Sequence, residues 1–182
     1  MTQIAPVILL VLRLTLAFIF VTALAHKLKD PRAFSAAVAE YQLLPSALLI
    51  PGTAALLLLE VLVVLALVLP GLGHFGAWGA VASLTLYAGA MSVNLARGRR
   101  DIDCGCSGPA LRQQLSEWLV LRNATLVALA VLAAQPTTGR ALSSWDASTI
   151  AFGVVALLLL SSTTNHLIAN QPKLKALFPS YD

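Results

Sequence analysis

The chain has 182 residues, of which 58% are hydrophobic and 11% are charged, with a formal net charge of +4 and a mean hydropathy of +0.83. Soluble domains carry about 25% charged residues and at most about 50% apolar ones, so this composition excludes an ordinary soluble enzyme, a disordered chain and a nucleic-acid reader. It predicts a helical membrane protein with several spans, because each spanning helix needs about 20 mostly apolar residues.

Five apolar runs are long enough to cross a membrane, and they predict an all-α bundle forming one membrane domain over residues 1–182. A bilayer admits only helices and closed barrels as spanning structures, and these runs lack the alternating pattern of barrel strands. The fourth run is the least apolar of the five. The expected spans are residues 5–25, 47–69, 75–95, 115–134 and 148–168.

The segment between the first two runs is expected to form a short amphipathic helix at the membrane interface. Asp30 and Pro31 are typical of a helix start, with proline at the first helical position. The apolar residues that follow fall on one face of such a helix: Phe34, Ala37, Val38 and Tyr41.

Small residues line one side of the third run, where Gly73, Gly76 and Gly79 are followed by Ser83. Small side chains allow helix backbones to approach closely, so this stripe predicts tight packing against another helix.

Basic residues alternate between the loops. They occur in the first loop, the third loop and the C-terminal tail, while the second loop has none and the fourth has only Arg140. The rule that cytoplasmic loops are rich in Lys and Arg then places the N-terminus outside and the C-terminus in the cytoplasm. The residues are Lys27, Lys29, Arg32, Arg97, Arg99, Arg100, Arg112, Lys173 and Lys175.

The two cysteines, Cys104 and Cys106, are separated by Gly105 in the third loop, residues 97–112. A disulfide needs Cα atoms within about 7 Å of each other, and a fully extended pair at this spacing lies near that limit. Gly105 can adopt a positive φ and fold the pair together. The small ring is expected to be strained and therefore labile, which favours a bond that is made and broken in a catalytic cycle.

Two other interpretations of the pair stay open. Thiolates bind soft metal ions, but His26, His74 and His166 supply no second pair at ligand spacing, so no metal site is expected. The cysteines could also be inert turn residues, although their isolated placement in a glycine-containing, charged loop favours redox chemistry.

Charged residues inside the predicted spans are costly and normally pair within a bundle. An ion pair between Arg13 and Glu60 is expected, because they lie in neighbouring runs. The alternative is a polar pocket for a quinone head group or a proton relay. Glu117, Arg122 and Asn123 could likewise form a polar network, or orient a redox partner or quinone near the thiols.

The end of the first run contains His26 and Lys27, and both are expected to extend to the membrane interface. His166, near the end of the fifth run, is expected to be structural.

Two stretches carry a family resemblance. The first comprises Leu12-Arg13-Leu14, Phe18, His26-Lys27-Leu28-Lys29-Asp30-Pro31, Phe34 and Tyr41-Gln42-Leu43-Leu44-Pro45, and the second comprises Asp103-Cys104-Gly105-Cys106-Ser107-Gly108. Together they resemble the methylamine utilization protein MauE family and related DoxX-like membrane proteins, over most of the chain. In that family an aromatic residue usually follows the Cys-Gly-Cys segment, where this chain has Ser107.

The resemblance implies a role in maturing methylamine dehydrogenase, a periplasmic quinoprotein whose small subunit carries several disulfides and a tryptophan-derived cofactor. It implies a thioredoxin-like partner, MauD, and disulfide formation in that small subunit. Carried over residue by residue, it makes Cys104 and Cys106 the catalytic redox pair and leaves Arg13 and Lys27 as family positions without an assigned role. Membrane lipid is the other expected partner, and a quinone is the one candidate cofactor.

A periplasmic client conflicts with the charge pattern, which places the cysteines on the cytoplasmic side. The loop could be reached alternately from both sides, which is the favoured explanation; one run could fail to span; or the thiols could pass electrons to a membrane quinone. Whether the protein is an enzyme stays open. The alternatives are a non-redox assembly or export factor, and a quinone-linked oxidoreductase subunit with Arg13, Glu60 and Arg122 around the head group.

Overall fold

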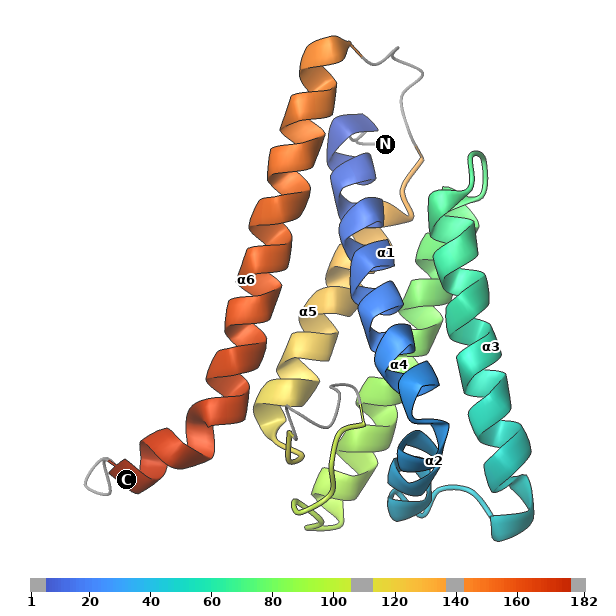
Figure 1. Cartoon of the computed structure of the whole chain (residues 1–182), viewed down its shortest axis with the longest axis vertical. Helices are drawn as coiled ribbons and strands as arrows, with labels where there is room; N and C mark the ends of the chain where they lie inside the picture. Colours follow the sequence, from blue (N-terminus) through green and yellow to red (C-terminus); the bar gives the residue numbers. More distant parts are fainter. Residues whose placement is uncertain (1–5, 106–112, 137–142, 178–182) are drawn as a thin grey trace.

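The computed structural model describes residues 6–105, 113–136 and 143–177, and Figure 1 shows that helices dominate this part of the chain. The predicted all-α fold is confirmed. The elements in chain order are α1 (Pro6–Lys29), α2 (Pro31–Glu40), the short 3-10 helix η1 (Ser46–Leu48), α3 (Leu49–Val68), α4 (Gly73–Ala96), α5 (Glu117–Ala133) and α6 (Ser144–Leu177).

Each of the five predicted apolar runs corresponds to one long helix. Within the described residues, four helical segments are long and apolar enough to cross a membrane: Pro6–Lys29, Ser46–Val68, Gly73–Ala96 and Trp145–Asn170. The remaining long helix, α5, corresponds to the fourth predicted run. It has 17 residues, which is the lower limit of spanning length. The ends differ from expectation, because α1 continues to Lys29 and α6 continues to Leu177.

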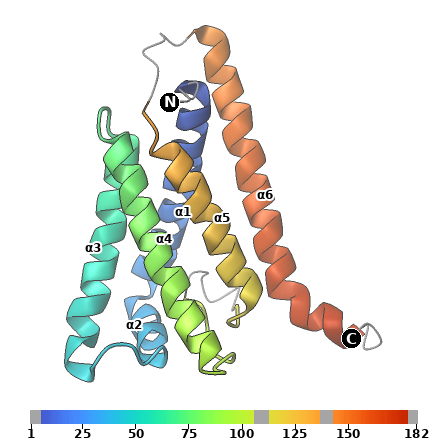
Figure 2. The same cartoon turned by 180° about the vertical axis from the view of Figure 1, so that it is seen from behind.

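The helix α1 lies at the centre of the bundle (Figure 1). It packs against α3 on one side and against α5 and α6 on the other, while α4 packs against both α3 and α5. Figure 2 shows the same arrangement from behind, with the C-terminal end of α6 extending past the N-terminal end of α5. The core is apolar, with Leu16, Phe20, Val63, Ala77 and Ala130 in one buried cluster.

The outer faces of the bundle carry large apolar side chains. Phe18, Phe75 and Phe152 are 53%, 67% and 77% exposed. A soluble protein rarely leaves so much apolar surface uncovered, whereas a bilayer would cover it. The exposed faces therefore agree with a multi-pass membrane protein.

The glycine stripe allows α3 and α4 to approach closely, as predicted. A Cβ atom added at Gly76 would lie 2.5 Å from the backbone nitrogen of Leu67 and 2.6 Å from the carbonyl carbon of Ala66. Only a residue without a side chain fits at such a distance.

The predicted helix after Asp30 is confirmed as α2. The carboxylate of Asp30 caps the helix by accepting a 2.9 Å hydrogen bond from the backbone N–H of Ala33, and Pro31 is the first helical residue. Phe34 is buried, and the opposite face of α2 is exposed.

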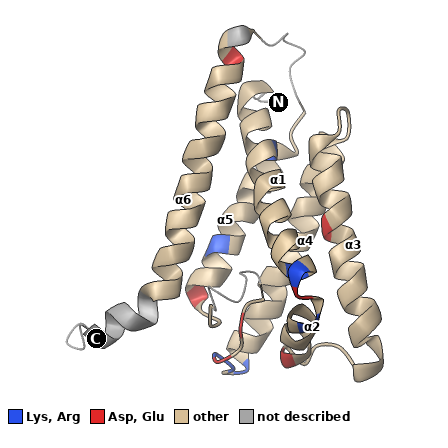
Figure 3. Ribbon diagram, in the orientation of Figure 1, with Lys and Arg blue, Asp and Glu red and all other residues tan. Residues whose placement is uncertain are grey.

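Basic residues gather at one end of the bundle, as Figure 3 shows. This end carries α2, the C-terminal end of α4 and the N-terminal end of α5. The first and third loops therefore share an end, as the charge pattern predicted. Which side of a membrane this end faces stays a prediction.

Candidate functional site

The chain folds back on itself around Cys104. After α4, the segment Ile102–Cys104 runs antiparallel to residues Gln113–Leu115, with a bridge between Asp103 and Gln114. The N–H of Cys104 donates to the carbonyl of Gln113 at 2.9 Å, and the N–H of Leu115 donates to the carbonyl of Ile102 at 3.1 Å. This pairing holds the first cysteine at the N-terminal end of α5.

Gly105 has the positive φ that the sequence predicted, at 68°. Its N–H donates to a side-chain oxygen of Asp103 at 3.2 Å, which tightens the turn. Few other residues adopt this backbone conformation without strain. Cys106 lies outside the described residues, as do Ser107 and Arg112.

The helix α2 covers this turn. Cys104 is 7% exposed and packs in a cluster with Met91, Ile102, Leu115 and Leu119. The hydroxyl of Tyr41, just after α2, donates to the carbonyl of Cys104 at 3.3 Å. A Cβ added at Gly105 would lie 3.2 Å from the Cβ of Ala37, so α2 lies directly against the turn. The exposure of the turn therefore depends on the position of α2.

A buried ion pair between Lys27 and Glu60 lies next to this cluster. The hydroxyl of Tyr87 donates to the same Glu60 oxygen at 2.6 Å, and Lys27 donates to that hydroxyl at 3.3 Å. The ammonium also lies 4.9 Å from the ring centre of Phe34 and 4.7 Å from that of Tyr87, which are cation–π distances. Four helices, α1 to α4, thus meet around one ammonium group.

This arrangement overturns two expectations. Lys27 does not extend to the interface, since its side chain is 4% exposed, whereas His26 is exposed. The expected Arg13–Glu60 pair is wrong as well. The guanidinium of Arg13 instead donates to the carbonyl of Ala133 at 3.0 Å and, more weakly, to that of Gln135 at 3.4 Å.

The partners of Arg13 have a physical explanation, because the last carbonyls of a helix lack intrahelical donors and carry partial negative charge. His74 contacts the carbonyl of the residue between these two, with its Nδ1 atom 2.6 Å from the oxygen of Ala134. Arg13 and His74 therefore cap the C-terminal end of α5, which is far from the cysteine turn.

The polar residues of α5 separate into a surface group and an internal group. Glu117 pairs with Arg100 at the surface, where the hydrogen bond and the carboxylate charge raise the pKa of Arg100 above its usual value. Asn123 is buried, and its side chain donates to the carbonyl of Leu119 at 2.9 Å.

Arg122 bridges three segments. Its Nη1 atom donates to the side-chain oxygen of Asn165 at 2.7 Å and to that of Gln113 at 3.4 Å. Gln113 in turn donates to the carbonyl of Asn165 at 3.0 Å. Arg122 thus belongs to a polar network, but with Gln113 and Asn165 in place of the expected Glu117 and Asn123. Sequence reasoning did not identify Gln113 or Asn165 as members.

The structure does not bring Arg13, Glu60 and Arg122 to one place. Arg13 binds the end of α5 at Ala133, eleven residues beyond Arg122 and about 16 Å further along the helix axis. Glu60 is held by Lys27 and Tyr87. In the described part of the chain, no three His, Cys, Asp or Glu side chains lie together as metal ligands would.

The first stretch of the family resemblance converges on the cysteine turn. Lys27 and Phe34 meet at the buried ion pair, and Tyr41 reaches the carbonyl of Cys104. The spacing of these residues was visible in the sequence. Their partners on α3 and α4, Glu60 and Tyr87, could be found only from the packing of the helices.

The geometry defines a class: a multi-pass helical membrane protein with a buried charged cluster beneath a cysteine turn. Residues 5–135 match the family described as "Methylamine utilisation protein MauE". The chain belongs to this family. It is 36% identical over 165 residues to methylamine utilization protein MauE of Paracoccus denitrificans, covering 88% of each chain.

Two further relatives support this assignment. The MauE protein of Methylophilus methylotrophus is 32% identical over 157 residues, which cover 85% of this chain and 83% of the relative. That of Paracoccus versutus is 37% identical over 129 residues, which cover 71% and 69%. No solved structure matches the chain. Family membership supports a role in methylamine utilisation.

Proposed function

We propose that this protein is an inner-membrane maturation factor for methylamine dehydrogenase, which forms disulfides in its small subunit by thiol–disulfide exchange at Cys104 and Cys106. The observation that carries the proposal is the turn at Gly105, whose φ of 68° is a conformation that glycine adopts readily, at the position where a ring between two cysteines needs a tight turn. The relatives named for methylamine utilisation support the client, and the family resemblance supports a thioredoxin-like, MauD-like partner.

The proposed exchange begins with the pair oxidised. A client thiolate attacks the sulfur of Cys106, forms a mixed disulfide and releases Cys104 as thiolate. A second client thiolate then attacks its own mixed-disulfide sulfur and releases Cys106, so the client loses two electrons and the pair gains them. We assign the first attack to Cys106 because Cys104 is only 7% exposed.

The reduced pair then returns its two electrons to the disulfide of the thioredoxin-like partner. Cys106 attacks that disulfide, and Cys104 resolves the mixed disulfide and closes the ring. The partner leaves as a dithiol, which balances the cycle without a bound cofactor.

The test is to replace Cys104 and Cys106 by serine, singly and together, and to measure disulfides in the client's small subunit. We expect each variant to lose client oxidation. Cys104→Ser should also trap a mixed disulfide through Cys106, which mass spectrometry would identify. Ser92→Ala is the control, because Ser92 lies exposed on α4 and bonds only its own helix.

Normal client oxidation by the double variant would exclude the redox mechanism and favour a non-redox assembly or export factor. Trapping by Cys106→Ser rather than Cys104→Ser would reverse the two assigned roles.

A further inference from the structure

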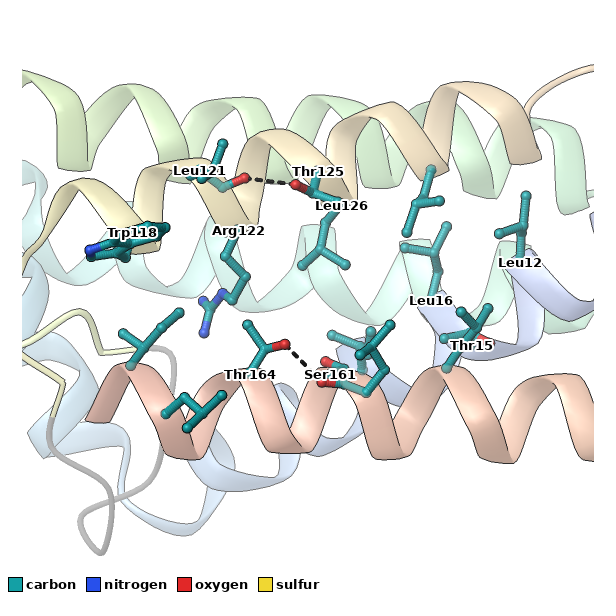
Figure 4. A pocket seen from close by; sticks show the side chains of 16 residues that line it. Leu12, Thr15, Leu16, Trp118, Leu121, Arg122, Thr125, Leu126, Ser161 and Thr164 are labelled. Carbon is teal, nitrogen blue, oxygen red and sulfur yellow. Dashed lines mark hydrogen bonds between the residues drawn. The ribbon is translucent and has the colours of Figure 1, made fainter. Parts of the chain in front are cut away.

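A cleft of about 600 Å³ runs between α1, α5 and α6. This volume is typical of sites for small molecules. It exists because α6 packs against α1 but hardly against α5, so a space remains between these two later helices. Figure 4 shows an elongated space with Leu12 and Leu16 of α1 towards one end and Trp118 and Arg122 of α5 towards the other.

The lining is mostly apolar, and its charged residue, Arg122, lies towards one end, whereas Thr15 and Ser161 add neutral hydroxyls further along. Most of the wall consists of leucine and isoleucine side chains from all three helices. Thr125 and Thr164 also line the cleft, but their hydroxyls donate to carbonyls of their own helices, at Leu121 and Leu160. The cleft therefore suits a long apolar chain that ends in a polar group.

Arg122 supplies a positive charge at the polar end. The ion pairs within the described residues join Lys27 to Glu60 and Arg100 to Glu117, so neither carboxylate serves Arg122. Its hydrogen-bond partners, Asn165 and Gln113, are neutral amides, and its Nε atom is buried without a partner. In the described part of the chain Arg122 is therefore a cation with neutral partners, and a cation beside an apolar cleft favours an anionic group there.

The depth of Arg122 matches a lipid head group. It lies five residues after Glu117, the first residue of α5, and thus about 7 Å inside the helix end. Trp118, which lines the same end of the cleft as Arg122 (Figure 4), is 52% exposed, and tryptophan is enriched at the membrane–water interface.

We propose that this cleft is a binding site for one anionic phospholipid, with an acyl chain along the leucine wall and the phosphate at Arg122. The charge of Arg122 selects an anionic head group over a zwitterionic one, and the bound chain fills the gap between α5 and α6. This site does not depend on the proposed redox chemistry.

The site is connected to the cysteine turn through a single residue. The side chain of Gln113 accepts from Arg122, and its backbone carbonyl accepts from the N–H of Cys104 at 2.9 Å. A lipid that positions Arg122 therefore also steadies the segment that holds Cys104.

Trp118 provides a direct reporter for the test. The purified Trp78→Phe/Trp145→Phe variant, with Trp118 as its remaining tryptophan, is reconstituted into phosphatidylcholine vesicles containing a small fraction of brominated phosphatidylglycerol, and fluorescence quenching is measured. A Trp118→Phe/Trp145→Phe variant is the matched control, because Trp78 lies outside the cleft and is similarly exposed, at 48%. We expect the quenching of Trp118 to report about a five-fold enrichment of phosphatidylglycerol over its fraction in the vesicle. This factor corresponds to about 1 kcal/mol, the attraction of one basic residue for an anionic lipid. The quenching of Trp78 should follow the bulk lipid composition.

Substitutions then assign the enrichment to Arg122. Arg122→Gln should abolish it, Arg122→Lys should retain it, and Arg100→Gln, which removes a charge at the same end outside the cleft, should also retain it. Circular dichroism of each variant checks that the helices are intact.

Bulk-like quenching of Trp118, or enrichment that survives in a folded Arg122→Gln variant, would overturn the proposal. So would Arg122-dependent quenching by an added quinone without any by phosphatidylglycerol, which would make the cleft a quinone site.

Discussion

At the scale of single residues, the buried pair of Lys27 and Glu60 imposes the strongest constraint. Both side chains are at most 4% exposed, so each charge has lost its water and depends on the other. The hydroxyl of Tyr87 also donates to the carboxylate of Glu60, and the ring of Phe34 makes a cation–π contact with the ammonium of Lys27. The second Glu60 oxygen, Oε2, is buried without a hydrogen-bond partner, which makes the loss of Lys27 still more costly.

We predict that Lys27→Met lowers the free energy of unfolding by about 3–5 kcal/mol, because it leaves a buried carboxylate unpaired. The double variant Lys27→Met/Glu60→Gln should recover most of this loss, since it leaves no buried charge. Denaturant titration in mixed micelles measures both. The control Glu117→Gln breaks an exposed pair and should cause no measurable change. Losses that simply add in the double variant would contradict a pairwise interaction.

The residues also show where sequence reasoning stops. Gly105 could be predicted to have a positive φ, because the requirement is local and glycine meets it. The partner of Glu60 could not be predicted from the sequence, because α1 contains two cationic residues, Arg13 and Lys27. Only the packing of the helices determines which of them reaches Glu60. Arg13 was already satisfied by the carbonyls at the end of α5.

At the scale of elements, the approach of α3 and α4 depends on the absence of a side chain at Gly76. The nearest atoms to an added Cβ belong to the backbone of Ala66 and Leu67, so no side-chain rotation can relieve the clash. The same helix offers a contrasting glycine, Gly89, where a Cβ would meet nothing within 4 Å.

We therefore predict opposite effects for the same substitution on α4. Gly76→Ala should lower the free energy of unfolding by about 1–3 kcal/mol, the usual cost of overpacking. Gly89→Ala should raise it by up to about 1 kcal/mol, because alanine favours the helix more than glycine does. Thermal unfolding of both variants in one detergent provides the comparison, and equal shifts would show that the close contact between α3 and α4 does not contribute to stability.

Helices were easier to predict from the sequence than the contacts between them, because a helix depends on residues that are close in sequence. The amphipathic helix α2 was visible because its cap, Asp30, and its apolar face lie within a dozen residues of sequence. The position of α2 over Gly105 was not visible, because Ala37 and Tyr41 meet the cysteine turn across more than sixty intervening residues.

At the scale of the whole molecule, the basic residues of the first and third loops lie at the same end of the bundle, and the second loop lies at the other end (Figure 3). The helices therefore alternate in direction, as the charge pattern required. The rule for basic loops makes the basic end cytoplasmic, and the cysteine turn lies at that end. A periplasmic client then requires that the turn be accessible from the periplasmic side during exchange.

We predict the sidedness with two matched substitutions in a background where Cys104 and Cys106 are serine. Ser46→Cys places a thiol at the basic end, before α3, and Ser143→Cys places one at the opposite end, before α6; both positions are exposed. A membrane-impermeant maleimide should label Ser143→Cys in whole cells with a permeable outer membrane, and Ser46→Cys only in inverted vesicles. Labelling of both on one side would contradict the alternating bundle, and exchanged labelling would reverse its orientation.

The same reagent applied to the native cysteine pair then tests its access from each side of the membrane. Labelling from both sides would support a turn that is reached alternately from both. Labelling of the pair in whole cells alone, together with labelling of Ser46→Cys in whole cells, would place the redox pair directly in the periplasm.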